Sequence, residues 1–118
     1  MSYKNFYSSV FILCFMSFVY AYGDSNILNN PGFEKGREGW FSRTCAIKAV
    51  SSPVYNGNGS LKVFKRTQTW QGAKQSVFGR IAEGKTYKVS AWAKLDNAGT
   101  DLVTISFEKQ DDSGINYI

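Results

Sequence analysis

Trp70 is the residue whose surroundings suggest chemistry. It lies in a short polar segment, residues 66–72, that also contains an arginine, two threonines and two glutamines. Such polarity disfavours burial in an apolar core. An indole held among hydrogen-bonding groups suits a sugar, because the C–H face of a pyranose stacks on the ring while fixed polar groups match its hydroxyls. A second interpretation stays open, in which Trp70 is half-buried and covers a sheet edge.

The chain lacks histidine, on which many catalytic sites depend. It has no histidine and two cysteines, which excludes a Ser-His-Asp triad, a Cys-His pair and a His- or Cys-rich metal site. A glycosidase needs only two carboxylates. Two pairs are candidates, Glu34 with Glu38 and Glu108 with Asp111, but both lie in turn-like sequence where solvated acids are common. We therefore predict no catalytic site within these residues.

The first 23 residues have the layout of a secretory signal peptide. Lys4 precedes an apolar run at residues 10–19, and Ala21 and Gly23 offer small residues to the peptidase. The run is short for a bilayer-spanning helix, although an uncleaved anchor remains an alternative. Cleavage after Ala21 or after Gly23 fits the pattern. We take Gly23, which makes residues 24–118 a secreted, extracellular domain with no membrane association.

Neither the cysteines nor the net charge points to a sharper function. Cys14 leaves with the leader, so Cys45 has no partner for an internal disulfide and is expected to pack as a small buried side chain. A reactive thiol or an intermolecular bridge is the alternative. The net charge is +5, but the basic residues are scattered. This pattern indicates a solvated surface and no nucleic-acid partner.

Short β-rich segments separated by Gly, Asn and Asp turns follow the leader. The expected strands are residues 45–50, 60–65, 75–78, 87–95, 102–109 and 115–118. Inward-facing positions are Leu61, Val63, Tyr87, Val89, Val103, Ile105 and Phe107. Residues 111–114 form a turn, for which an ordinary Asp-Gly turn is a better explanation than calcium. The pattern predicts an all-β, antiparallel sandwich, with its last strands expected beyond Ile118 because the chain stops inside a strand-like segment.

Five blocks, taken in order and spacing, resemble a known family. They are NILNNPGFE at 26–34, GSLKV at 59–63, RTQTWQG at 66–72, GKTY at 84–87 and VSAWAK at 89–94. The set resembles the carbohydrate-binding modules of families 4, 9 and 22. The Arg-Thr-x-x-Trp-x-Gly run is similar to family 22, the xylan-binding type often attached to family 10 xylanases.

The resemblance implies a jelly-roll, galactose-binding-like sandwich with an open cleft for xylan and a structural calcium. By position, Trp70 matches the main stacking aromatic, Arg43 the cleft arginine and Tyr117 a second cleft aromatic. Glu34 matches the glutamate linked to calcium. The sequence departs from the family at Thr44, where a glycine usually follows the arginine.

Trp92 is a further candidate for the cleft. It shares the polar face of its expected strand with Lys88, Ser90 and Lys94, and burial under a loop is the alternative. The resemblance implies a non-catalytic module that keeps an attached glycoside hydrolase on xylan or a related β-1,4 hemicellulose. Two alternatives stay open: an amino-terminal fragment of a secreted endo-1,4-β-xylanase whose catalytic domain lies beyond residue 118, and an adhesion domain that binds no sugar.

Overall fold

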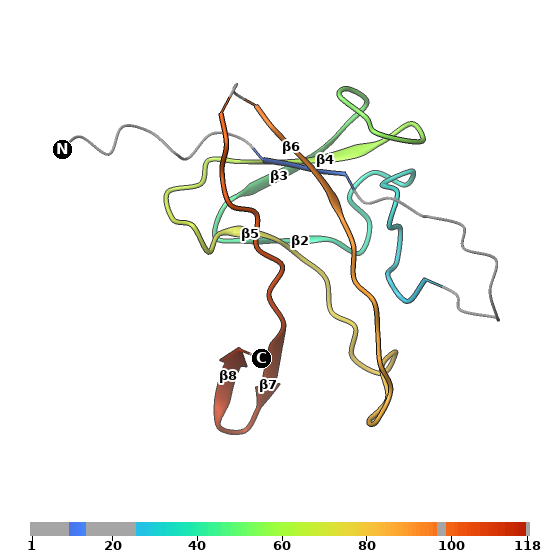
Figure 1. Cartoon of the computed structure of the whole chain (residues 1–118), viewed down its shortest axis with the longest axis vertical. Coiled ribbons are helices and arrows are strands. Elements are labelled where there is room, and N and C mark those ends of the chain that lie inside the picture. Colours follow the sequence, from blue (N-terminus) through green and yellow to red (C-terminus); the bar gives the residue numbers. More distant parts are fainter. Residues whose placement is uncertain (1–9, 14–25, 97–98, 118) are drawn as a thin grey trace.

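The computed structural model describes residues 10–13, 26–96 and 99–117 (Figure 1). These residues contain eight strands and no helix. The strands are β1 (Val10–Leu13), β2 (Phe41–Arg43), β3 (Ala46–Val50), β4 (Ser60–Phe64), β5 (Gly72–Lys74), β6 (Trp92–Leu95), β7 (Glu108–Asp111) and β8 (Gly114–Tyr117). Every pairing is antiparallel, so the predicted all-β, antiparallel class is confirmed.

The strands form three small sheets, an arrangement consistent with a β-sandwich. The largest has the order β3-β4-β1-β6, while β2 pairs with β5 and β7 pairs with β8. Figure 1 shows the β7–β8 hairpin extending away from the other strands, below β2 and β5 in this view. The hairpin does not belong to the four-stranded sheet, and it approaches the end of β2 from outside that sheet.

The core is centred on β4, which has a partner strand on each side. Leu61 and Val63 are almost completely buried, as their alternation predicts. Phe33, from the segment before β2, is buried as well, and its ring packs against Trp40 with centroids 5.2 Å apart. Ser60 at the start of β4 is buried too, and its hydroxyl donates a hydrogen bond to the Pro53 carbonyl at 2.6 Å. These contacts fix β4 on the loops around it.

The predictions for the later strands are partly wrong. The expected strand at 87–95 forms only as β6, that at 102–109 only from Glu108 onward, and that at 75–78 is replaced by β5. Positions expected to face inward are largely exposed, among them Tyr87, Val89, Val103, Ile105 and Phe107. Alternation predicts which side chains share a face, but burial also needs a partner strand and an opposing layer, and residues 99–107 pair with no described strand.

β1 falls inside the predicted signal peptide. Its backbone pairs with β4 through Val10 and Val63, and with β6 through Val10 and Leu95. A mature chain beginning at residue 24 would not contain this strand. Lys4, Cys14 and the two proposed cleavage positions lie outside the described residues, so the leader stays a prediction. The described residues include no helix long and apolar enough to cross a membrane.

Candidate functional site

Four side chains from distant parts of the chain meet at the end of β2. The Arg43 guanidinium donates a hydrogen bond from Nη2 to the Tyr117 hydroxyl and forms an ion pair through Nη1 with Glu108. Its central carbon lies 5.2 Å from the centroid of the Trp70 ring and 5.3 Å from that of Tyr117. We call these four residues the Arg43 cluster. It brings together three of the sequence-predicted candidates, Arg43, Trp70 and Tyr117.

The β7–β8 hairpin supplies the other side of the cluster. Glu108 and Tyr117 face each other directly across the two strands. Directly opposed residues in an antiparallel pair project from the same face, so one face of the hairpin presents both a carboxylate and a phenol to Arg43. The sequence indicates Glu108 only as half of a glycosidase pair. The sequence signal that could have revealed this role is the turn at residues 111–114. Once that turn is placed, the pairing of the two strands sets Glu108 opposite Tyr117.

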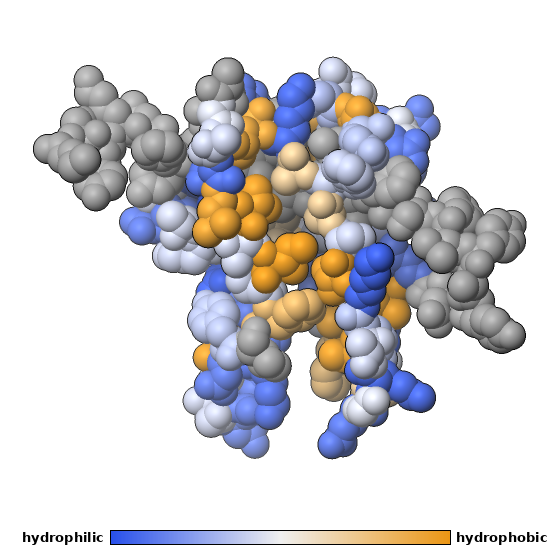
Figure 2. Space-filling model, in the orientation of Figure 1, coloured by the Kyte–Doolittle hydropathy of each residue, from blue (hydrophilic) through white to orange (hydrophobic). Residues whose placement is uncertain are grey.

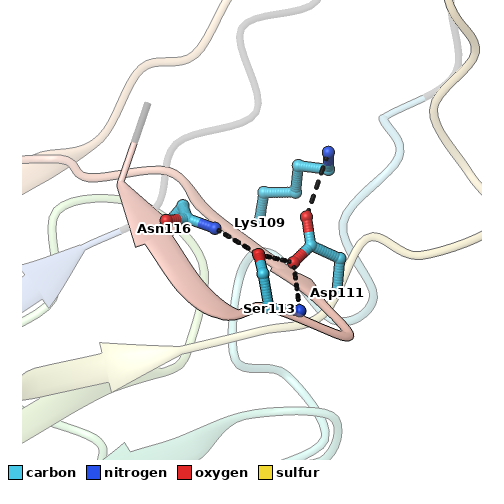
Figure 3. Close-up of polar contacts among 4 residues, drawn as sticks. All are labelled: Lys109, Asp111, Ser113 and Asn116. Carbon is cyan, nitrogen blue, oxygen red and sulfur yellow. Dashed lines mark hydrogen bonds and ion pairs between the residues drawn. The ribbon is translucent and has the colours of Figure 1, made fainter.

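The turn of this hairpin is held by Asp111 (Figure 3). Its carboxylate accepts hydrogen bonds from the Ser113 amide, at 3.0 Å, and from the Ser113 hydroxyl, and it forms an ion pair with Lys109 at 3.2 Å. The Ser113 hydrogen bonds, followed by Lys109, lower the pKa of Asp111 below its ordinary value. The predicted turn at residues 111–114 is confirmed, and it fixes the register that places Glu108 opposite Tyr117.

Trp70 is presented by a loop that is organised from within by Gln71. This side chain is 7% exposed, and its amide oxygen accepts hydrogen bonds from the backbone N–H of Thr67, at 2.5 Å, and of Gln68, at 3.0 Å. Its amide nitrogen donates to the Thr44 carbonyl at 2.6 Å. Gln71 therefore ties the Trp70 loop to the residue that follows Arg43, which the sequence analysis did not foresee.

Arg66 fixes the same loop from the other end. Its guanidinium donates to the carbonyls of Gln71 and Thr69, each at 2.8 Å. The polarity that singled out this segment thus serves partly to hold its backbone. Within the cluster, the Trp70 side chain remains 50% exposed. The loop therefore holds a half-open indole at a defined position next to a cation.

The backbone at Arg43 is unusual. Thr44, which follows it, has a φ of +54°. A β-branched residue in this left-handed region is strained, and it stands where the resembling family usually has glycine. Across the β2–β5 pair, Gly72 faces Arg43, and a Cβ added at Gly72 would meet nothing within 4 Å. The space beside the Arg43 side chain is therefore left open.

Cys45 and Trp92 occupy other surroundings. The Cys45 thiol lies 3.3 Å from the Gly72 carbonyl, and partial burial raises its pKa, which keeps the thiol protonated. Cys45 is thus only partly buried, and its role as a packing residue stays a prediction. Trp92 lies on β6, in the four-stranded sheet, where its half-exposed ring stacks on Tyr55 with centroids 4.2 Å apart. Its role in the cleft stays a prediction.

Glu34, the calcium-linked candidate, holds a turn. Its carboxylate accepts the backbone N–H of Asn58 at 2.7 Å and the Asn58 side-chain amide at 3.2 Å, and these hydrogen bonds lower its pKa. Gly57 in this turn has a φ of +77°, which favours glycine, and a Cβ there would displace the Glu34 carboxylate from its hydrogen bonds. In the part of the chain that the structure describes, no three His, Cys, Asp or Glu residues group to hold a metal. Glu34 is therefore not part of such a group among these residues, and calcium stays a prediction.

Comparison with known families decides what kind of domain carries this cluster. A family model, CBM_4_9, a carbohydrate binding domain, matches residues 25–118. The chain belongs to this family. The resemblance drawn from the five sequence blocks is confirmed, and the module is a carbohydrate-binding one. No solved structure matches it.

Curated relatives of the module are much longer enzymes. It is 33% identical to Endo-1,4-beta-xylanase A of Thermoanaerobacterium saccharolyticum over 78% of this chain and 8% of that protein. It is 36% identical to Endo-1,4-beta-xylanase 2 of Arabidopsis thaliana over 80% of this chain and 10% of that protein. It is 29% identical to Exoglucanase XynX of Acetivibrio thermocellus over 92% of this chain and 12% of that protein. The module thus spans about a tenth of the length of these relatives.

Proposed function

We propose that the module binds xylan or a related β-1,4-linked hemicellulose chain at the Arg43 cluster. The observation that carries this proposal is a half-exposed indole fixed beside a guanidinium and a phenol, in a chain of the carbohydrate-binding family. The naming of several relatives as endo-1,4-β-xylanases favours xylan among the β-1,4 glycans. The exoglucanase among them makes glucan the comparison to test.

In this proposal the sugar ring lies against Trp70 and its hydroxyls meet Arg43. Stacking on an aromatic ring contributes about 1–3 kcal/mol per ring, by analogy with stacking on nucleic-acid bases. The guanidinium supplies charge-assisted hydrogen bonds to hydroxyl or ring oxygens. The hydrogen bonds of Gln71 and Arg66 hold the loop in place beforehand, which reduces the entropy lost on binding. A xylose ring, which lacks the hydroxymethyl arm of glucose, fits a cluster of this kind with less steric hindrance.

We also propose that the module is part of a longer secreted polypeptide. The short coverage of the relatives supports an attached glycoside hydrolase, and the leader-like first 23 residues support export. A module of this kind raises the local concentration of its enzyme on the polymer. The catalytic activity of any such enzyme belongs to the other domain.

The test removes the indole. Trp70→Ala is expected to weaken binding to soluble xylan by about 10-fold or more, as the loss of one stacking contact implies, measured by affinity electrophoresis and calorimetry. Phe78→Ala removes another exposed aromatic and is the matched control, with no expected effect. Trp92→Ala shows whether the second indole also contributes. Wild-type affinity in Trp70→Ala would refute the Arg43 cluster as the binding site.

A structural calcium linked to Glu34 remains part of the proposal on the strength of the resemblance. Its ligands besides Glu34 would have to be backbone or amide oxygens, or groups outside the described residues. Thermal unfolding with calcium, with magnesium and with a chelator checks it. A melting temperature that rises with calcium alone, and no longer rises in Glu34→Gln, would support it, whereas an unchanged wild-type melting temperature would contradict it.

A further inference from the structure

We propose that Glu108 makes the module selective for uncharged glycans, by positioning Arg43 and compensating its charge. This inference rests on the proposed function, because it concerns the same cluster. It adds a residue that the sequence resemblance did not assign, and it states which chemical class of ligand the cluster rejects: chains that carry carboxylates, such as xylan substituted with uronic acids.

The geometry gives both terminal nitrogens of Arg43 a partner. Glu108 engages Nη1 and the Tyr117 hydroxyl engages Nη2, so each terminal nitrogen already has a partner. The Trp70 and Tyr117 rings lie 5.2 and 5.3 Å from the guanidinium carbon. A carboxylate binds an arginine most strongly through two parallel N–H groups. A carboxylate that approaches both terminal nitrogens must therefore compete with Glu108 and with the Tyr117 hydroxyl, while single N–H bonds to sugar hydroxyls remain available.

The charge balance points the same way. The Arg43 and Glu108 side chains are 24% and 25% exposed, so solvent screens this pair only in part. Other charged groups on the adjoining elements are placed differently: Arg66 donates to loop carbonyls, Lys109 pairs with Asp111, and Lys74 lies opposite Phe41 at the other end of the β2–β5 pair. Glu108 is therefore the anion that offsets Arg43. Without it, a chain of net charge +5 would present an unpaired guanidinium to acidic polymers.

The hairpin register explains why Glu108 can act together with Tyr117. The two residues are direct partners at the open end of the β7–β8 pair, so they approach Arg43 from the same face. A shortened carboxylate at 108 would keep the charge but lose the reach. Positioning and charge compensation can therefore be separated by two different substitutions at this one residue.

The experiment compares Glu108→Gln, Glu108→Asp and Asp112→Asn with wild type. Asp112 lies in the turn of the same hairpin, so Asp112→Asn changes the net charge by the same amount as Glu108→Gln, away from the ion pair. Binding is measured by calorimetry against an unsubstituted xylan oligosaccharide and against the same backbone carrying glucuronic acid. Each titration is run at low and at high sodium chloride, and near-ultraviolet circular dichroism verifies folding.

In wild type, we expect no preference for the acidic oligosaccharide. In Glu108→Gln, the affinity ratio of acidic to neutral ligand should rise by about 5-fold or more at low salt, in line with an added charge-assisted contact. High salt should reduce this gain, because an exposed charge pair is screened. Glu108→Asp should weaken neutral binding by about 3-fold without raising the ratio, while Asp112→Asn should match wild type. A structural role for Glu108 alone would lower both affinities and leave the ratio unchanged.

Two results would overturn the inference. One is a folded Glu108→Gln protein with the wild-type ratio. The other is an equal change of ratio in Asp112→Asn, which would assign the effect to overall charge. If either occurs while Trp70→Ala still weakens xylan binding as expected, only the role of Glu108 fails. If folded wild type binds neither oligosaccharide, the proposed function fails, and the inference falls with it.

Discussion

Residues 26–74 and residues 75–117 have similar β-rich sequences but very different packing. In the first region, Leu61 and Val63 of β4 are buried, and β4 pairs with β3 of the same region on one side and with β1 on the other. In the second, Val103 and Ile105 alternate in the same way, yet each is about half exposed. The difference teaches that an alternating pattern specifies a face, whereas burial depends on a second layer to cover that face.

The two regions also differ in how side chains hold the backbone. The first is tied together over long sequence separations, by Gln71 to Thr44 and by Glu34 to Asn58. The second is attached to it by side chains such as Gln75, which bonds the backbone N–H and carbonyl of Asn29, and Arg80, which donates to the Ile27 carbonyl at 2.6 Å. The Arg43 cluster is where the regions meet, with two residues from each. Figure 2 shows that apolar residues gather in the middle of this view of the molecule, while hydrophilic residues cover much of the two lobes at the bottom.

The largest expected effect tests the contrast in packing directly. Leu61→Ala removes a fully buried side chain and should lower the free energy of unfolding by about 2–5 kcal/mol. Ile105→Ala, at a position that is 50% exposed, should cost less than about 1 kcal/mol. Urea unfolding followed by tryptophan fluorescence measures both. Equal losses would show that the second region is covered by another layer in solution.

A smaller effect is expected at the end of β2, inside the well-packed region. Thr44→Gly should raise the free energy of unfolding by about 1 kcal/mol, because glycine adopts the positive φ without the strain of a β-branched side chain. Thr44→Ala retains a Cβ and serves as the control, with a gain well below that of glycine. A destabilised Thr44→Gly protein would mean that the threonine side chain makes a compensating contact. The same urea titration checks this prediction.

The smallest effect compares the carboxylates that hold one turn in each region. Asn58 lowers the pKa of Glu34, and Ser113 lowers that of Asp111. The folded protein therefore binds fewer protons than the unfolded chain near these pKa values, and stability falls as the pH drops below about 4.5, the ordinary value for Glu34. Glu34→Gln should flatten the decline of the melting temperature between pH 5 and pH 3, because it removes the lowered pKa of Glu34. Asp111 should contribute less to this decline, because it holds only its own hairpin. An unchanged decline would place the acid sensitivity elsewhere.

The sequence predicted the fold class and much of the cluster, for identifiable reasons. Leu61 and Val63 follow from alternation, and the turn at residues 111–114 follows from its Asp and Gly. The grouping of Arg43, Trp70 and Tyr117 followed from the family resemblance. Glu108 and Gln71 were missed, because their roles depend on contacts across strands and loops that no local pattern records. The predicted burial of residues 102–107 was wrong for a related reason. A local pattern does not show whether another layer of the fold covers a strand.

The pairing of Glu108 with Tyr117 limits how this hairpin can vary. Side chains along a strand point alternately to opposite faces, so adding or deleting one residue in the tip would turn one of the two away from Arg43. A length change that shifts one strand by two residues would leave Glu108 and Tyr117 on the same face, but the two residues would no longer lie directly opposite each other. Natural variation in the tip is therefore expected in residue identity more than in length, and grafting a longer tip would disconnect the carboxylate from the phenol before it disturbed any other strand.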